Sequence, residues 1–264
     1  MNVHHVLPIR SVALLASVVA VVAGCGSSSP SSPIVPTLSP AASQFAQPGL
    51  AFRWPDGDRP TVSRELAGTD EAYINPGAVI DHGGQLHMFA NVFTAWPGRV
   101  EIRHLVSDDG ASWSLAEEAP AFTSDDVPFA DPGVDASTGF VAEDGTWVLL
   151  VETVNQSGPW DIGVATAPGP GGPWTIGPDP VLSAGPAGAA DAAGLPWPSV
   201  VTTNDGYAMY YTASQTGSRD GAIARATSSD GRTWTKDPAP VFVACPESEH
   251  GGLDRPRVVA TPDG

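Results

Sequence analysis

The hydrophobic residues of this chain fall into short runs that are bounded by turn-forming residues. The segments 147–151 and 207–211, for example, are apolar or aromatic throughout, and the turn glycines Gly145 and Gly206 stand just before them. Apolar runs of this length between turn residues are typical of β-strands, whereas helices need longer periodic segments. Gly (29 residues) and Pro (27 residues) are also abundant, as expected for a chain with many turns. The pattern predicts an all-β fold.

Two series of landmark residues recur along the chain with the same period. The first is a tryptophan that closes a similar turn at intervals of 61 and 60 residues: Trp113, Trp174 and Trp234. The second is a turn glycine at intervals of 61, 61 and 58 residues: Gly84, Gly145, Gly206 and Gly264. Prolines stand eight residues before three of these glycines: Pro76, Pro198 and Pro256. Two series in phase indicate an array of β-propeller blades.

Each period contains four short hydrophobic segments, which is what a four-stranded antiparallel blade needs. The strands are predicted at 78–80, 86–91, 100–106 and 121–123 in the first unit, at 140–142, 147–152, 162–166 and 181–182 in the second, and at 199–203, 207–212, 222–227 and 241–244 in the third. The blades are predicted at about 72–127, 128–190, 191–247 and, incomplete, 248–264. Three blades and the first strand of a fourth cannot close a ring, so we expect the natural protein to continue beyond Gly264.

The N-terminus has the features of an export signal. Arg10 precedes an apolar run at 12–22, which is too short to span a bilayer but suits the hydrophobic region of a signal peptide. Residues 22–25 resemble a bacterial lipobox, which implies cleavage after residue 24, a lipid on Cys25 and anchoring to the membrane of the cell envelope. The alternative is an ordinary secretory signal with an incidental cysteine. Residues 25–48 are rich in Ser and Pro and are predicted to form a tether to a propeller domain at 49–264.

Charge and cysteine content narrow the range of functions. A formal net charge of −17 argues against nucleic acid as a partner, since phosphate binding needs Lys and Arg. No pair of histidines stands at metal-ligand spacing within the predicted propeller, and the sequence has neither a cysteine cluster nor a calcium-loop spacing, so no metal and no cofactor are predicted. If Cys25 carries lipid, Cys245 has no partner within the chain, and we expect it to be a buried free thiol or to pair beyond Gly264.

The turns that end in tryptophan have a structural explanation. In Ser-x-Asp-Gly-x-x-Trp, found at 107–113 and 228–234, the Ser and Asp side chains cap turn amides, Gly supplies a positive φ, and Trp packs across the hairpin base. The motif resembles the Asp-box of sialidase-type propellers. We therefore expect Asp109 and Asp230 to be structural. His87 and His104 alternate along predicted strands and are expected to be packed or solvated side chains rather than ligands.

Candidate functional residues lie where the innermost strand of each blade begins. In a propeller these starts converge on the central axis, so side chains there can surround one ligand. The starts are expected at 74–77, 130–135, 195–198 and 253–256. They contain three carboxylates: Asp131, Asp135 and Asp254.

An acidic residue before Pro at a blade start, followed by a short apolar strand and Asp-Gly, is similar to the five-bladed propeller glycoside hydrolases of families 32, 43, 62 and 130. The segments 162–175 and 209–234 add to the likeness, which covers residue 72 to the end. Asn75-Pro-Gly-Ala with Asp131-Pro looks most like family 130, the mannoside phosphorylases and hydrolases, although Gly133 stands where that family has Arg. In the family 43 pattern, Asn75 replaces the general base, Trp197 lies near the second carboxylate, and Asp254 replaces the glutamic acid.

The resemblance implies a five-bladed propeller and an activity on the glycosidic bonds of an oligosaccharide. Hydrolysis needs an acid and a second carboxylate, whereas phosphorolysis needs an acid and cations that hold phosphate. We expect Asp131 to be the acid, with Asp135 as its rival, and Asp254 to lie across the funnel. A turn-capping role for Asp131 is the alternative.

The expected substrate-binding residues are Asn75, Trp197, Arg255 and Arg257. Blade packing is the other explanation for Trp197. At the level of function, the alternatives are a non-catalytic glycan-binding or scaffold propeller, favoured by Asn75 in place of an acid, and, more remotely, a sialidase-like enzyme.

Overall fold

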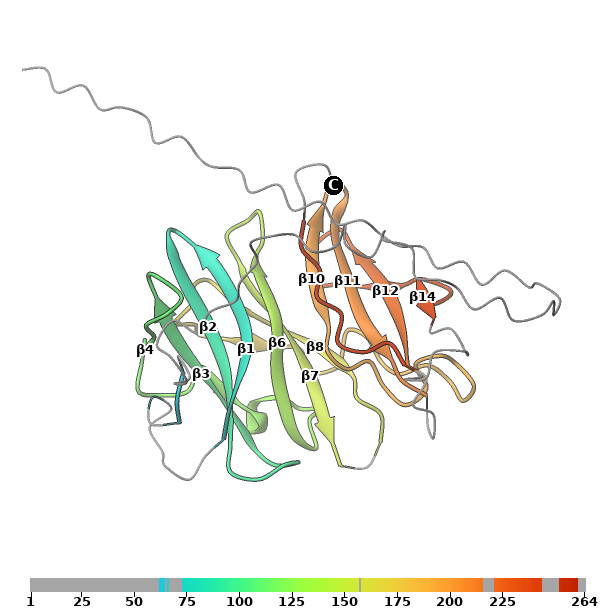
Figure 1. The fold of residues 1–264 in the computed structure, drawn as a ribbon, viewed down its shortest axis with the longest axis horizontal. Helices are drawn as coiled ribbons and strands as arrows, with labels where there is room; N and C mark the ends of the chain where they lie inside the picture. Colours follow the sequence, from blue (N-terminus) through green and yellow to red (C-terminus); the bar gives the residue numbers. More distant parts are fainter. Residues whose placement is uncertain are drawn as a thin grey trace, which may run out of the picture.

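The computed structural model describes residues 62–64, 66, 73–156, 158–215, 221–243 and 252–260, and its regular structure consists of three antiparallel sheets (Figure 1). The all-β class is therefore confirmed. Within these residues the helical content is one short 3-10 turn, η2 (Ser124–Asp126), and no helix is long and apolar enough to cross a membrane. The predicted signal peptide and tether, Cys25, Cys245 and Gly264 lie outside the described residues.

Each sheet is one blade, and its strands are hydrogen-bonded in chain order from the inside outward. The first contains β1 (Tyr73–His82), β2 (Gln85–Phe93), β3 (Val100–Ser107) and β4 (Ser114–Leu115), with β5 (Phe122–Thr123) also paired to β3. The second contains β6 (Pro132–Val141), β7 (Trp147–Asn155), β8 (Ile162–Ala167) and β9 (Thr175–Ile176). The third contains β10 (Ser199–Thr203), β11 (Gly206–Ala213), β12 (Ala222–Ser228) and β13 (Thr235–Lys236), with β14 (Phe242–Val243) paired to β12.

The innermost strands of the first two blades are longer than predicted. β1 and β6 include the polar residues Asn75 and Asp135, which the sequence pattern placed before the strands. In both strands the register shifts within the next three residues, between Asn75 and Ala78 and between Ala136 and Thr138. These bulges break the alternation of apolar and polar residues, so the pattern detected only the regular part of each strand.

The first strand of the predicted fourth blade is not formed as a strand. Residues 252–260 have no regular secondary structure and are instead fixed to the third blade. The amide of Leu253 donates to the carbonyl of Gly221 (3.0 Å), and the amide of Val258 donates to the hydroxyl of Ser199 (3.1 Å). Within the described residues no further strand lies beside this segment, so it has no ladder to join.

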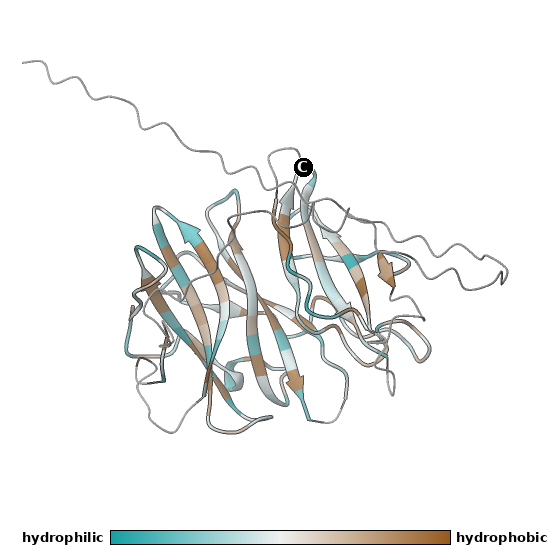
Figure 2. Cartoon of the chain, in the orientation of Figure 1, coloured by the Kyte–Doolittle hydropathy of each residue, from teal (hydrophilic) through white to brown (hydrophobic). Residues whose placement is uncertain are grey.

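The hydrophobic core lies between the blades, and β7 contributes to both parts of it. Leu149 and Val151 pack toward the first blade, whereas Val148 and Leu150 pack toward the third. Hydrophobic segments accordingly follow the strands of all three sheets (Figure 2). A strand covered on both faces has no polar face, which explains the continuous apolar run at 147–151.

The Asp-Gly turns have the predicted geometry. In the third blade, Asp230 Oδ1 accepts hydrogen bonds from the amides of Arg232 (2.8 Å) and Thr233 (2.7 Å), and Trp234 Nε1 donates to the carbonyl of Gly231 (3.2 Å). These hydrogen bonds lower the pKa of Asp230 to about 2. The turn at 107–113 repeats the arrangement, which gives these aspartates a structural role.

Candidate functional site

Five of the residues singled out in the sequence lie around one cavity of about 350 Å³ at the ends of the blades where β1, β6 and β10 begin. They are Asn75, Asp135, Trp197, Arg255 and Arg257. The innermost strands lie side by side, with their hairpins at the opposite, upper end in Figure 1. We call this space the axial cavity.

The other two predicted carboxylates do not line the axial cavity. Asp131 is exposed, and its amide donates to Asn155 Oδ1 (3.2 Å) at the base of the β6–β7 pair. Asp254 is also exposed and lies 3.7 Å from the Nε atom of Arg255. The structure thus brings Asp135, rather than Asp131, to the position where the starts of the blades converge.

Asp135 has a second carboxylate as its direct neighbour. Glu152 on β7 is its cross-strand partner, and the two side chains are only 6% and 1% exposed. Burial raises the pKa of Asp135 to about 7. Burial and the charge of Asp135 raise the pKa of Glu152 to about 8. Two adjacent buried carboxylates titrate as a pair, so this pair retains at least one proton near neutral pH.

The two carboxylates differ in their hydrogen bonds. Glu152 Oε2 accepts from the amide of Trp197, and the side chain of Ser137 also bonds to Glu152. Asp135 Oδ1, in contrast, makes no hydrogen bond within the described part of the chain. A buried carboxyl oxygen with no partner, on a residue that lines a cavity, is free to bond to a ligand. Both residues line the axial cavity, and Asp135 is the one with an unpartnered carboxyl oxygen.

The equivalent pair in the first blade consists of amides. Asn75 is the cross-strand partner of Asn91, 60 and 61 residues before Asp135 and Glu152 respectively. Asn91 Oδ1 accepts a hydrogen bond from the amide of Ala136 (2.8 Å), next to Asp135, and so ties the first blade to the bulge in β6. The same backbone arrangement thus carries acids in one blade and neutral hydrogen-bonding groups in the next.

Three indole side chains form part of the wall: Trp96, Trp160 and Trp197. The ring centroids of Trp96 and Trp160 lie 6.5 Å apart, and those of Trp160 and Trp197 lie 6.3 Å apart, with near-perpendicular planes in both pairs. Trp96 is 49% exposed, so it offers a ring face at the rim of the cavity. Aromatic faces of this kind bury the apolar faces of ligands while leaving polar groups free for other partners.

Two residues of the axial cavity have an unusual backbone conformation. Trp197 (φ 58°) and Arg255 (φ 53°) are the non-glycine residues with positive φ in the described part of the chain. Such conformations cost about 1–3 kcal/mol for bulky residues and concentrate at functional sites. The Arg255 guanidinium lies 4.5 Å from the centroid of the Trp197 ring, which is a cation–π contact. The strained backbone therefore places an indole and a guanidinium together in the cavity wall.

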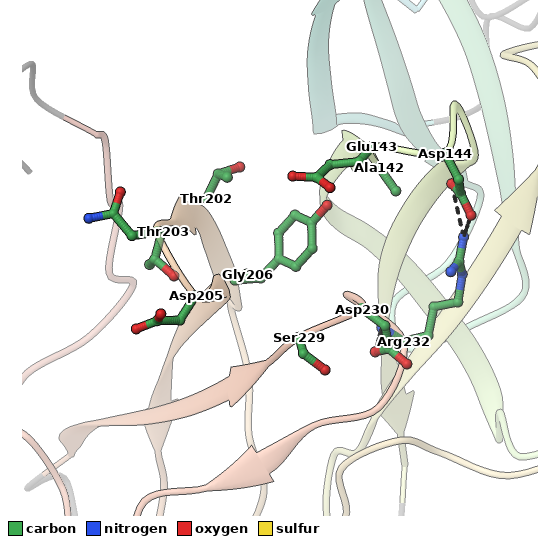
Figure 3. A pocket seen from close by; sticks show the side chains of 12 residues that line it. Ala142, Glu143, Asp144, Thr202, Thr203, Asp205, Gly206, Ser229, Asp230 and Arg232 are labelled. Atoms are coloured by element: carbon green, nitrogen blue, oxygen red, sulfur yellow. Dashed lines mark hydrogen bonds and ion pairs between the residues drawn. The ribbon is translucent and has the colours of Figure 1, made fainter.

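A second cavity, of about 490 Å³, lies at the opposite end of the blades between the second and the third (Figure 3). Arg232 reaches across from the β12–β13 turn to Asp144 on the β6–β7 hairpin (3.0 Å, dashed in Figure 3). Two carboxylates here are bonded within their own turns: hydrogen bonds from Thr146, with the contact to Arg232, lower the pKa of Asp144 to about 2, and turn amides do the same for the pKa of Asp230. The axial cavity, in contrast, contains buried carboxyl groups with raised pKa values. The axial cavity is therefore the candidate functional site.

Five residues that line this cavity were not predicted from the sequence: Asn91, Trp96, Ser137, Glu152 and Trp160. Glu152 is a charged residue directly after the apolar run 147–151, and that position was its signal. Trp96 and Trp160 lie in the connections between the second and third strands of their blades, where no regular pattern marks them. Among the described residues no group of three or more His, Cys, Asp or Glu side chains is arranged to hold a metal ion.

Comparison with known proteins confirms the fold. No protein-family profile and no curated protein matches the sequence. Among solved structures, the chain is similar to Zg3597, a family 117 glycoside hydrolase of Zobellia galactanivorans (20% identity, TM-score 0.56, 67% of this chain and 59% of that chain). It is also similar to fructan 1-exohydrolase IIa from Cichorium intybus (18% identity, TM-score 0.52, 67% and 34%) and to the sucrose-6-phosphate hydrolase of Lactobacillus gasseri (16%, 0.51, 61% and 33%).

The resemblance to propeller glycoside hydrolases is thereby confirmed at the level of the fold. The chain spans about three fifths (59%) of the length of the family 117 protein. The closer likeness to family 130 stays a prediction.

Proposed function

We propose that the protein is an exported lipoprotein whose propeller binds an oligosaccharide in the axial cavity and acts on one of its glycosidic bonds. The observation that carries the proposal is the Asp135–Glu152 pair, which holds a proton near neutral pH, includes an unpartnered carboxyl oxygen and lines a cavity walled in part by indoles. Propeller glycoside hydrolases share the fold, which supports this choice of ligand class.

Asp135 is the acid in this proposal. Cleavage of a glycosidic bond requires a proton for the leaving oxygen, and a carboxyl group with a pKa near 7 is suited to donate it at neutral pH. Glu152 is a positioning residue: it is the buried cross-strand partner of Asp135, and the Trp197 amide fixes its orientation.

The test is turnover of an oligosaccharide panel by the protein and by two variants. Asp135→Asn is expected to abolish release of reducing sugar while glycan binding persists, because the amide fills the same space but cannot donate a proton in the same way. Asp131→Asn is the control and should retain activity, since its side chain lies outside the axial cavity. Equal turnover by wild type and Asp135→Asn would refute the role of Asp135.

A second function, glycan binding without turnover, is favoured by one observation. The first blade presents Asn75 and Asn91 where the second presents Asp135 and Glu152, so the described part of the cavity holds its carboxylates on one side only. A glycan array that gives specific binding, combined with no product from the bound sugars, would decide for this function.

The lipid anchor is proposed from the sequence of residues 12–25. Cys25→Ser should move the protein from the membrane fraction to the soluble exported fraction. Mass spectrometry of the N-terminal peptide should show a diacylglycerol-modified Cys25 in the wild type. Equal membrane association of the two proteins would contradict the anchor.

A further inference from the structure

Two arginines line the axial cavity together with the carboxylate pair. Arg255 and Arg257 belong to the segment 252–260, whereas Asp135 and Glu152 belong to the second blade. The chain has only 12 basic residues against 29 acidic ones. Two of these few cations therefore share one cavity, which calls for an explanation.

The protein itself does little to neutralise these cations. Arg255 lies 3.7 Å from Asp254, but both side chains are more than half exposed (66% and 53%), so solvent weakens this ion pair. Within the described residues Arg257 makes no ion pair; its Nη1 donates to the carbonyl of Pro256 at 3.4 Å. The nearest buried acids, Asp135 and Glu152, keep at least one proton between them near neutral pH. In the described part of the chain neither arginine forms an ion pair with a buried acid, although the charge of Arg257 partly offsets the rise in the pKa of Glu152.

The backbone at both arginines is held in place, and the guanidinium of Arg255 is fixed as well. The amide of Arg255 donates to Thr212 Oγ1 (3.0 Å), and the amide of Val258, beside Arg257, donates to Ser199 Oγ (3.1 Å). The Arg255 guanidinium is stacked on Trp197 despite a positive φ at both residues. A cation fixed in this way loses less conformational entropy when it binds a ligand than a free surface arginine does.

We infer that Arg255 and Arg257 form an oxyanion-binding subsite of the axial cavity, next to the indole wall that takes the sugar. The inference rests on the proposed function, in which the cavity receives a glycan. Guanidinium groups bind carboxylate, sulfate and phosphate oxygens through paired hydrogen bonds. The oxyanion is either part of the sugar, as in a uronic acid, or inorganic phosphate bound beside a neutral sugar.

The experiment measures binding of three probes to the protein at low ionic strength by calorimetry: glucuronate-containing oligosaccharides, their neutral glucose counterparts and inorganic phosphate. Arg255→Gln and Arg257→Gln should each weaken binding of the anionic probe about tenfold, because each removes a charge-assisted hydrogen bond. Arg232→Gln, at the other end of the blades, is the matched control and should bind as the wild type does. Both cavity arginines are exposed, so the variants are expected to fold normally.

The outcomes separate the sources of the anion and the two proposals. Preference for the glucuronate probe, lost in the arginine variants, identifies a sugar-borne anion, and arginine-dependent phosphate binding identifies the free anion. The anion subsite would be overturned by three results together: equal affinity for neutral and acidic sugars, no change of that affinity in Arg257→Gln, and no binding of phosphate. These results would leave the proposed function intact. Arginine-dependent phosphate binding with no glycan bound at all would support the subsite and contradict the proposed function.

Discussion

Replacing Asp135 by Asn should make the stability of the protein less dependent on pH, because the change removes a buried titrating group and keeps its shape. Burial raises the pKa of Asp135 from 3.8 in the unfolded chain to about 7 in the folded one. Between these values the folded chain holds a proton that the unfolded chain has released. The stabilising contribution is therefore fully present below pH 3.8 and is lost as the pH rises through 7.

The size of the effect follows from these two pKa values. The difference between 3.8 and about 7 corresponds to roughly 4 kcal/mol once the pH exceeds both. About 3 kcal/mol of this is lost between pH 5 and pH 8.5, so the wild type should lose about that much more free energy of unfolding than Asp135→Asn over this interval. The variant also lacks the charge of Asp135 that helps to raise the pKa of Glu152. Its loss makes the free energy of unfolding of the variant still less dependent on pH.

Urea unfolding followed by tryptophan fluorescence at pH 5 and pH 8.5 measures the difference. Asp131→Asn is the control, since it removes an exposed carboxylate of the same strand end without altering the axial cavity. Equal loss of stability in the wild type and Asp135→Asn between the two pH values would show that Asp135 is not buried as described. The reasoning about its role as an acid would then fail as well.

Three further measurements test other parts of the structure. Burial and the charge of His87 lower the pKa of His104 to about 4, so its contribution to the free energy of unfolding is present above pH 6.5 and is lost as the pH falls toward 4. His104→Phe should reduce this loss by roughly 3 kcal/mol in acid unfolding curves, and a curve unchanged from the wild type would show that His104 is not buried as described. Gly77→Ala should destabilise the protein by about 1–3 kcal/mol in urea, because the new methyl group meets two backbone carbonyl oxygens, whereas Gly169→Ala, in open space, should stay within about 0.5 kcal/mol. Trp160→Ala should weaken oligosaccharide binding about tenfold by calorimetry with little change in melting temperature, and an unchanged affinity would remove this indole from the ligand site.

Much of the architecture could be predicted from the sequence because its signals are local. The turn at 228–234 needs its Ser, Asp, Gly and Trp at fixed positions, so its recurrence set the period and the hairpins. The predicted strand 207–212 lies within β11 (Gly206–Ala213) for the same reason. The bulged strand starts at Asn75 and Asp135 were harder to place, since a bulge gives no regular alternation.

The site was only partly predictable because it is assembled from different blades. Asn75 and Arg257 are far apart in the chain and meet through the twist and spacing of three sheets. Glu152 belongs to a strand whose two faces both pack in the hydrophobic core, and only its pairing with Asp135 in the structure places it beside a cavity. Trp160 becomes relevant only once its distance from Trp197 is known.

The strand β7, which packs Leu149 and Val151 toward one neighbour and Val148 and Leu150 toward the other, has a consequence for how the protein opens. Neither blade interface can separate without uncovering side chains of this one strand. In repeat proteins, independent interfaces allow the units to unfold one at a time. Here the shared strand couples the two interfaces, so the three blades should unfold in one cooperative transition. The amides of β7 should then exchange with solvent only through global unfolding.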